Sequence, residues 1–233
     1  MTIFPKSTKN LSDLLLYLSD KASMGEEQIP SLPLLSKKLK ISVASLREQL
    51  EVARIMGFVE VKPRTGIRLL PFDFTPTMLI SVLYAIKVND NYFEKYRDFR
   101  NHLEAAYFLE AIGKLTRIEI NRLESIVKDA ENKINSNPPR LPHPEHREFH
   151  ALIFSKVDNP FIQSVFNVYW EIYEYLGYAI INDVDYLNRV WHYHRGVLEE
   201  IKNNNFNYAF ELFMEHKELI IRNNKLVPKL NFE

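Results

Sequence analysis

The 233-residue sequence contains no cysteine, which excludes disulfide bonds and any metal or catalytic site that depends on a thiolate. No apolar run approaches the roughly 20 residues that a membrane-spanning helix needs. The N-terminus also lacks the charged and apolar pattern of a signal peptide. We therefore expect a cytoplasmic protein without a membrane segment.

Several motifs of metal-dependent enzymes are missing as well. The sequence has no Glu-x-x-His pair of the kind found in di-iron helical bundles. It has neither the His-Glu-x-x-His motif of zinc proteases nor the His-Asp pair of metal phosphohydrolases. These absences argue against an enzyme, although a metalloenzyme stays open as an alternative.

The composition, 46% hydrophobic and 26% charged, is that of a globular protein with a large core. Residues 1–70 hold 11 basic and 7 acidic side chains, a net charge of +4. The rest of the chain therefore carries −4, because the overall net charge is zero. A basic front and an acidic back indicate two parts with different roles.

The first part shows the element order of a winged helix-turn-helix. Helical spacing and end signals predict three short helices, at 10–21, at 32–39, and from the N-cap Ser42 to Gly57. Two β-type runs follow at 58–61 and 67–70, joined by a turn at 62–66. In such domains the third helix enters the DNA major groove and the hairpin touches the backbone or minor groove.

The remainder reads as helical almost throughout. Residues 71–76 form a linker, and Thr75-Pro76 predicts the N-cap and first residue of the next helix. Thr116 and Glu119 predict a capping box. Helices are expected at 76–88, 91–114, 116–136, 144–157, 160–182, 184–203 and 205–224. We therefore predict a mainly α protein, with a winged helix-turn-helix over 1–70 and a bundle of six or seven helices over 77–233.

Four histidines lie on apolar stripes of three predicted helices. His146 and His150 are four residues apart on one face, while His194 and His216 share stripes with the apolar residues of later helices. A single buried histidine is more often a packing residue, and that alternative stays open for each of them. Together they can converge on one ion, since imidazole binds zinc, nickel and copper. His143 and His192 lie off the stripes and are expected to be solvated.

The front part resembles the DNA-binding domain of GntR-family bacterial regulators. The resemblance is carried by Ile29-Pro30-Ser31, Leu35-Ser36-Lys37-Lys38-Leu39, Ile41-Ser42, Leu46-Arg47-Glu48-Gln49-Leu50, Gly57-Phe58-Val59-Glu60-Val61-Lys62-Pro63 and Gly66. Pro33 and Val43 stand where the family often has arginine. The resemblance implies binding to double-stranded DNA through Lys37, Ser42, Ala44, Ser45, Arg47, Lys62, Arg64 and Gly66.

The back part resembles the FCD ligand-binding domain of the FadR-type GntR subfamily. The matching segments are 97–106, Phe149-His150, Asp158-Asn159-Pro160, His194-Arg195 and Met214-Glu215-His216. The resemblance implies a divalent transition metal, zinc first and nickel second, held by His146, His150, His194 and His216. His146 stands where the family has an aspartate.

A carboxylate effector is the other implication of this resemblance. Arg100 shares an inward stripe with Tyr96 and Tyr107, so its guanidinium can grip a small organic acid. The alternative is a buried ion pair between Arg100 and Glu104.

These observations predict a metabolite-responsive, homodimeric transcription regulator that acts as a repressor on a palindromic operator. Two alternatives stay open beside it. One is a dimerising adaptor with a non-functional winged helix, which the missing arginines motivate. The other is a metalloenzyme that uses the four-histidine site.

Overall fold

The computed structural model describes residues 11–177 and 183–222. The chain divides into two compact units, Met1–Thr77 and Met78–Glu233. The described residues form ten helices and one small three-stranded sheet. The predicted mainly α fold class, with a winged helix-turn-helix followed by a helical bundle, is confirmed.

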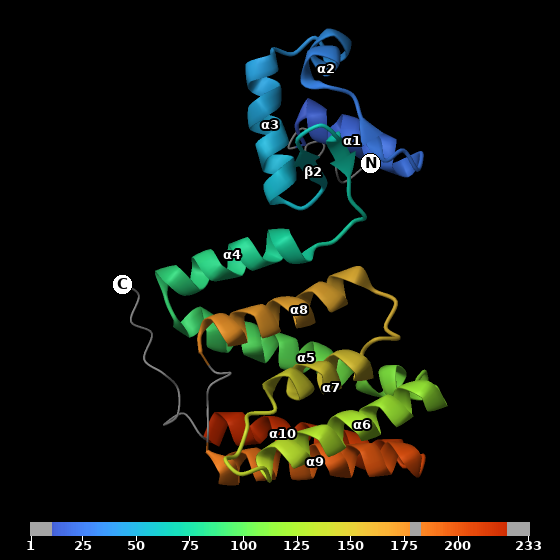
Figure 1. Cartoon of the computed structure of the whole chain (residues 1–233), viewed down its shortest axis with the longest axis vertical. Helices are drawn as coiled ribbons and strands as arrows, with labels where there is room; N and C mark the ends of the chain where they lie inside the picture. Colours follow the sequence, from blue (N-terminus) through green and yellow to red (C-terminus); the bar gives the residue numbers. More distant parts are fainter. Residues whose placement is uncertain (1–10, 178–182, 223–233) are drawn as a thin grey trace, which may run out of the picture. The chain divides into compact units, whose positions relative to one another are not determined.

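The first unit contains three helices and the sheet (Figure 1). Its elements are α1 (Asp13–Ser23), β1 (Gln28–Ile29), α2 (Leu32–Leu39), α3 (Val43–Ile55), β2 (Val59–Lys62) and β3 (Gly66–Leu69). All strands are antiparallel in the order β1-β3-β2, and Val59 lies opposite Leu69. β1 falls between the first two predicted helices, where no strand was predicted, because a two-residue strand is too short to show alternation.

Serine caps fix the helix starts in this unit. The Ser12 hydroxyl accepts the N–H of Leu15, so α1 begins at Asp13 and not at the predicted residue 10. The Ser42 hydroxyl accepts the N–H of Ser45 and caps α3 as predicted. Apolar faces then close a separate core, formed by Leu14, Tyr17, Leu18, Ile29, Leu35, Leu46, Ala53, Val59, Ile67 and Leu69.

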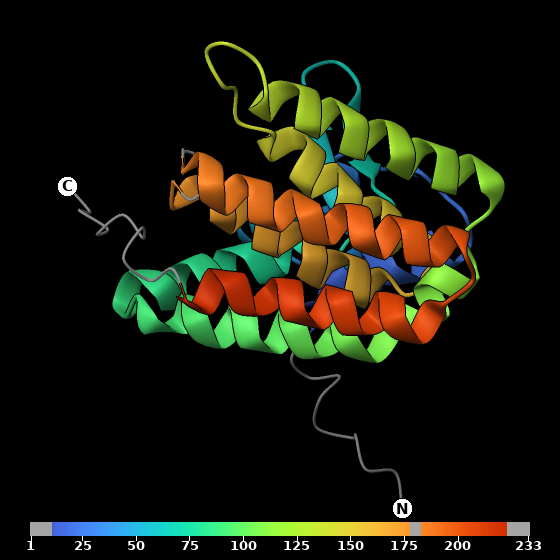
Figure 2. The ribbon, with the colours of Figure 1, turned by 90° about the horizontal axis from the view of Figure 1, so that it is seen from below.

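The second unit is a bundle built from the remaining helices. They are α4 (Thr75–Val88), α5 (Asn91–Gly113), α6 (Arg117–Ile134), α7 (His143–Ile153), α8 (Pro160–Tyr175), α9 (Val184–Lys202) and α10 (Phe206–Arg222). α9 packs against both α10 and α6, and α6 packs against α7 (Figure 2). α5 packs against α10, α8 and α7. Helix α7 therefore has neighbours on several sides and is well placed to carry a buried site.

Two helix boundaries in this unit were predicted wrongly. α7 ends at Ile153 and not at residue 157, because the Phe154 carbonyl accepts the N–H of Val157 in a tight turn. Thr75 lies inside α4 and is not its N-cap, since the Asp73 carboxylate accepts the Thr75 N–H instead. The capping box of Thr116 and Glu119 is present as predicted.

Two further helices were predicted to end beyond the described ranges, at residues 182 and 224, and the first of them ends earlier. α8 ends at Tyr175, and Gly177, with φ +78°, continues the chain in a left-handed conformation. The predicted residues 178–182 of this helix, and 223–224 of the last one, lie outside the described residues.

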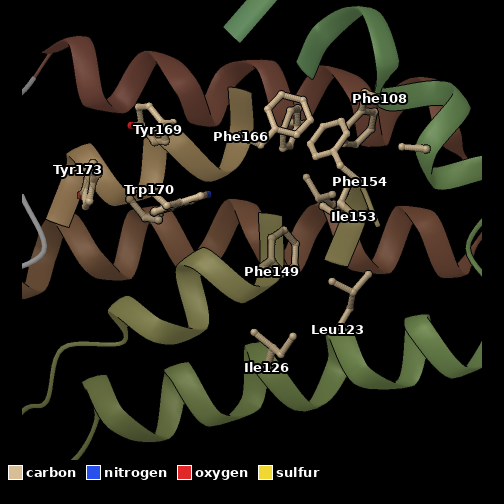
Figure 3. Close-up of a cluster of buried hydrophobic side chains, with 14 of the residues drawn as sticks. Phe108, Leu123, Ile126, Phe149, Ile153, Phe154, Phe166, Tyr169, Trp170 and Tyr173 are labelled. Atoms are coloured by element: carbon tan, nitrogen blue, oxygen red, sulfur yellow. The ribbon is translucent and has the colours of Figure 1, made fainter. Parts of the chain in front are cut away.

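A large aromatic and aliphatic core holds the bundle together. Figure 3 shows part of it, with Leu123 and Ile126 of α6, Phe149 and Ile153 of α7, Phe108 of α5, and Tyr169 and Trp170 of α8. Phe108 and Phe149 are fully buried. None of the helices in the described ranges is long and apolar enough to cross a membrane.

Candidate metal centre

The four histidines of the apolar stripes come together inside the bundle. His146 and His150 come from α7, His194 from α9 and His216 from α10. One ring nitrogen from each lies within 4.8 Å of the corresponding nitrogens of the other three. His150, His194 and His216 are each no more than 3% exposed, so the cluster is inside the protein.

The hydrogen bonds of His194 prepare one of its ring nitrogens for a metal. Its Nδ1 lies 2.7 Å from the Val190 carbonyl oxygen and donates to it. The neutral ring then has a free lone pair on Nε2. That Nε2 lies 3.3 Å from Nε2 of His150. Two nitrogens bound to one tetrahedral zinc are separated by about the same distance, given Zn–N bonds of about 2.0–2.1 Å.

Other ring nitrogens in the cluster have no partner. Among the described residues, Nε2 of His146 and both ring nitrogens of His216 are buried without a hydrogen bond. A buried polar atom without a partner costs roughly 1–3 kcal/mol. Coordination of a cation removes this cost, so the residues present fit a bound metal ion.

Burial also holds the four rings in the protonation state that metal ligands require. It lowers the pKa of His194 from 6.5 to about 4, partly opposed by the hydrogen bond to Val190. Burial is also the main reason why the pKa values of His146, His150 and His216 lie well below 6.5, and the positive charge of Arg100 adds to it for His146 and His150. All four imidazoles are neutral at pH 7, as metal binding requires.

A buried ionic network lies directly behind His150. The Glu104 carboxylate is fully buried and lies 2.5 Å from Nη2 of Arg100 and 3.2 Å from Nζ of Lys217. It also lies 3.3 Å from Nδ1 of His150. Arg100 itself approaches Nδ1 of His150 to 3.2 Å and stacks over the Tyr169 ring. Burial lowers the pKa of Lys217.

The predicted effector residues lie in different surroundings. Arg100 makes the ion pair with Glu104 that the sequence left open as an alternative. The Tyr96 hydroxyl donates to the Val165 carbonyl at 2.8 Å, and Tyr107 packs against the hydrophobic core. No role was predicted for Lys217, because an isolated lysine in a helix is normally exposed.

The histidines predicted to be solvated behave differently from one another. His192 is exposed, as predicted. His143 is not solvated, because its ring stacks on Tyr173 and its Nε2 lies 3.1 Å from a carboxylate oxygen of Glu174. Both contacts come from α8, which the sequence of α7 does not reveal.

The predicted DNA-contacting residues lie on α2, on α3 and on the hairpin of the first unit. Most of these residues are exposed: Lys37, Ser42, Ala44, Arg47, Lys62, Arg64 and Gly66. Ser45 is half-buried, and its hydroxyl accepts the side-chain amide of Gln49. Lys62 makes an ion pair with Glu60 at 2.7 Å.

Comparisons with known proteins agree with this architecture. The sequence pattern of the FCD domain matches residues 96–219. The solved structure of Streptococcus agalactiae GntR is similar at a TM-score of 0.64 and 19% identity, covering 92% of this chain and 99% of that one. E. coli McbR/YncC matches at a TM-score of 0.49 and 15% identity, covering 82% and 84%. No curated protein sequence is similar enough to count as a match.

A winged helix-turn-helix followed by a helical bundle defines a class of two-domain transcriptional regulators. Because the FCD match spans more than half of the sequence, the chain belongs to the FCD family of GntR-type regulators. The resemblance seen in the sequence is confirmed. The metalloenzyme alternative is not supported, since the family is one of regulators.

Proposed function

We propose that this regulator responds to a small organic acid through a metal site in its helical domain. His146, His150, His194 and His216 would hold one divalent metal ion, zinc first and nickel second. The first unit would bind a palindromic operator as part of a homodimer and act as a repressor. The observation that carries the proposal is the convergence of four neutral imidazoles from three helices, of which three are buried and that of His146 is half-buried.

The charges around the cluster support an anionic effector. Four neutral histidines bring no negative charge to a divalent ion, and His146 replaces an acidic residue of the family pattern. Glu104 is already shared between Arg100 and Lys217. Buried charge without compensation is costly. A bound metal would supply an electrophilic centre for a carboxylate, and Arg100 can hold such a group through two parallel hydrogen bonds.

DNA binding by the first unit can be tested with two exposed arginines. Arg47→Ala on α3 and Arg64→Ala at the tip of the hairpin should weaken binding to DNA from the protein's own upstream region, because both lose a contact with the duplex. If the contacts are to phosphate, the slope of log affinity against log salt should fall by about one per contact. A gel shift with salt titration measures both effects.

Arg54→Ala is the matched control for these variants. Arg54 is also exposed on α3, but it lies in the last turn and pairs with Glu51 at 2.5 Å. The N-terminal residues of a recognition helix make the base contacts, so Arg54→Ala should bind as the wild type does. Unchanged DNA affinity in both test variants would contradict DNA binding through this surface and would favour the alternative of an adaptor with a non-functional winged helix.

Arg100 separates effector binding from metal binding. Arg100→Ala should keep the metal and lose the response of DNA binding to mono-, di- and tricarboxylic acids, since the four histidines remain. The response is measured by fluorescence anisotropy of labelled operator DNA with metal-loaded protein. Retention of a full carboxylate response by this variant would remove Arg100 from the effector site.

A further inference from the structure

Glu104 is a fully buried carboxylate of α5 that the fold places against one of the histidines of the cluster. Three nitrogen-bearing groups surround it, on Arg100, Lys217 and His150, all within 3.3 Å. Neither carboxylate oxygen accepts a well-oriented hydrogen bond from a described residue. The Glu104 carboxylate can therefore accept a hydrogen bond from a neighbouring N–H group once that group is oriented toward it.

His150 presents its two ring nitrogens to different partners. Nε2 faces Nε2 of His194, while Nδ1 faces Arg100 and Glu104. The guanidinium of Arg100 can only donate, so Nδ1 of His150 accepts from it and the ring proton is on Nε2. That proton points to Nε2 of His194, which is free to accept because its Nδ1 donates to the Val190 carbonyl.

This arrangement satisfies both rings but leaves Nε2 of His150 without a lone pair for a metal. If Nε2 is to be a ligand, the neutral ring must carry its proton on Nδ1. The Nδ1–H group would then face an N–H of Arg100, which cannot accept it. The carboxylate of Glu104, 3.3 Å away, can.

We propose that Glu104 is the positioning residue of the metal site, accepting the Nδ1–H of His150 so that Nε2 faces the ion. Carboxylates commonly hold metal-ligating histidines in this way. Arg100 loses its acceptor on His150 in the same step but keeps its ion pair with Glu104, so one N–H of the guanidinium becomes available to an effector. This second consequence rests on the proposed function above.

The proposal is tested with Glu104→Gln, which keeps the size of the side chain and an acceptor oxygen but removes the charge. Zinc affinity, measured by competition with a chelator, should fall about 10- to 100-fold, as for other lost outer partners of metal ligands. Glu110→Gln is the matched control. Glu110 is on the same helix but exposed, where it pairs with Lys114 at 2.7 Å.

The NMR shift of the His150 Nδ1 proton is a readout that a purely structural role of Glu104 would not move, because it reports the hydrogen bond to the carboxylate. It should change in zinc-loaded Glu104→Gln and stay the same in Glu110→Gln. Nitrogen-15 NMR of histidine side chains should show His150 protonated on Nε2 in the zinc-free wild type and on Nδ1 in the zinc-loaded wild type. The wild-type comparison tests zinc binding through Nε2, which the role of Glu104 requires, even if Glu104→Gln fails to fold. The winged helix plays no part in it, because the site lies wholly within the second unit.

Each outcome has a defined meaning. A zinc-loaded protein in which His150 keeps its proton on Nε2, or a folded Glu104→Gln variant with wild-type zinc affinity, overturns the role of Glu104 and leaves the metal site intact. A wild-type protein that binds neither zinc nor nickel overturns the proposed function, and the role of Glu104 with it.

Discussion

Protein carrying His194→Ala should be purified with almost no bound metal, whereas the wild-type protein should carry about one transition-metal ion per chain. His194 offers the nitrogen best prepared for coordination, because its Nδ1 is already committed to the Val190 carbonyl. Loss of a direct ligand should cost more than the roughly 10- to 100-fold drop in affinity caused by losing an outer partner. Elemental analysis of protein never exposed to chelator measures the metal content.

His192→Ala is the control for this experiment. His192 lies two residues away on α9 and is exposed, so its removal should leave the metal content unchanged. His194→Gln provides a second test variant, since it leaves a smaller cavity and retains polar atoms. Thermal unfolding of each metal-free variant shows whether the bundle still forms. A folded His194 variant with a full complement of metal contradicts the four-histidine site.

The histidine cluster could be predicted from the sequence because it follows helical periodicity. His146 and His150 are one turn apart, and each of the four lies on a stripe that also carries buried apolar residues. A stripe of this kind fixes which way a side chain points before any tertiary contact is known. When three such stripes face the interior of one bundle, their histidine rings are expected to lie close together.

The surroundings of the cluster could not be predicted in the same way. Glu104 meets Lys217 across 113 positions of sequence, and no local pattern encodes that contact. From the sequence, Arg100 could either pair with Glu104 or bind an effector. Which groups lie near Arg100 depends on how α5 packs against α7 and α10. The strand Gln28–Ile29 exists only because β3 pairs with it. Each of these features depends on tertiary contacts between segments that are distant in the sequence.

Acid should destabilise the second unit of the metal-free protein selectively. The pKa of His194 is near 4 in the folded protein and 6.5 in an unfolded chain, so the unfolded state binds more protons between these values. Stability is therefore complete above pH 6.5 and falls as the pH drops toward 4. At 1.36 kcal/mol per pH unit, His194 alone accounts for a loss of about 2 kcal/mol at pH 5. His146, His150 and His216 act in the same direction, because their pKa values are lowered too.

This loss of unfolding free energy is large compared with a total stability of about 5–15 kcal/mol. The first unit, which has no histidine, serves as an internal control. All seven histidines and both tryptophans lie in the second unit. Trp170 and Trp191 lie beside the cluster, with ring centroids 5.0 Å from His146 and 4.9 Å from His194. Urea unfolding of chelator-stripped protein, followed by tryptophan fluorescence, should therefore show a midpoint that falls steeply from pH 7 to pH 5. Hydrogen exchange of residues 11–77 should change little over the same range, since that unit has no histidine. Equal unfolding free energies at pH 7 and pH 5 would show that the four rings are not held neutral by burial.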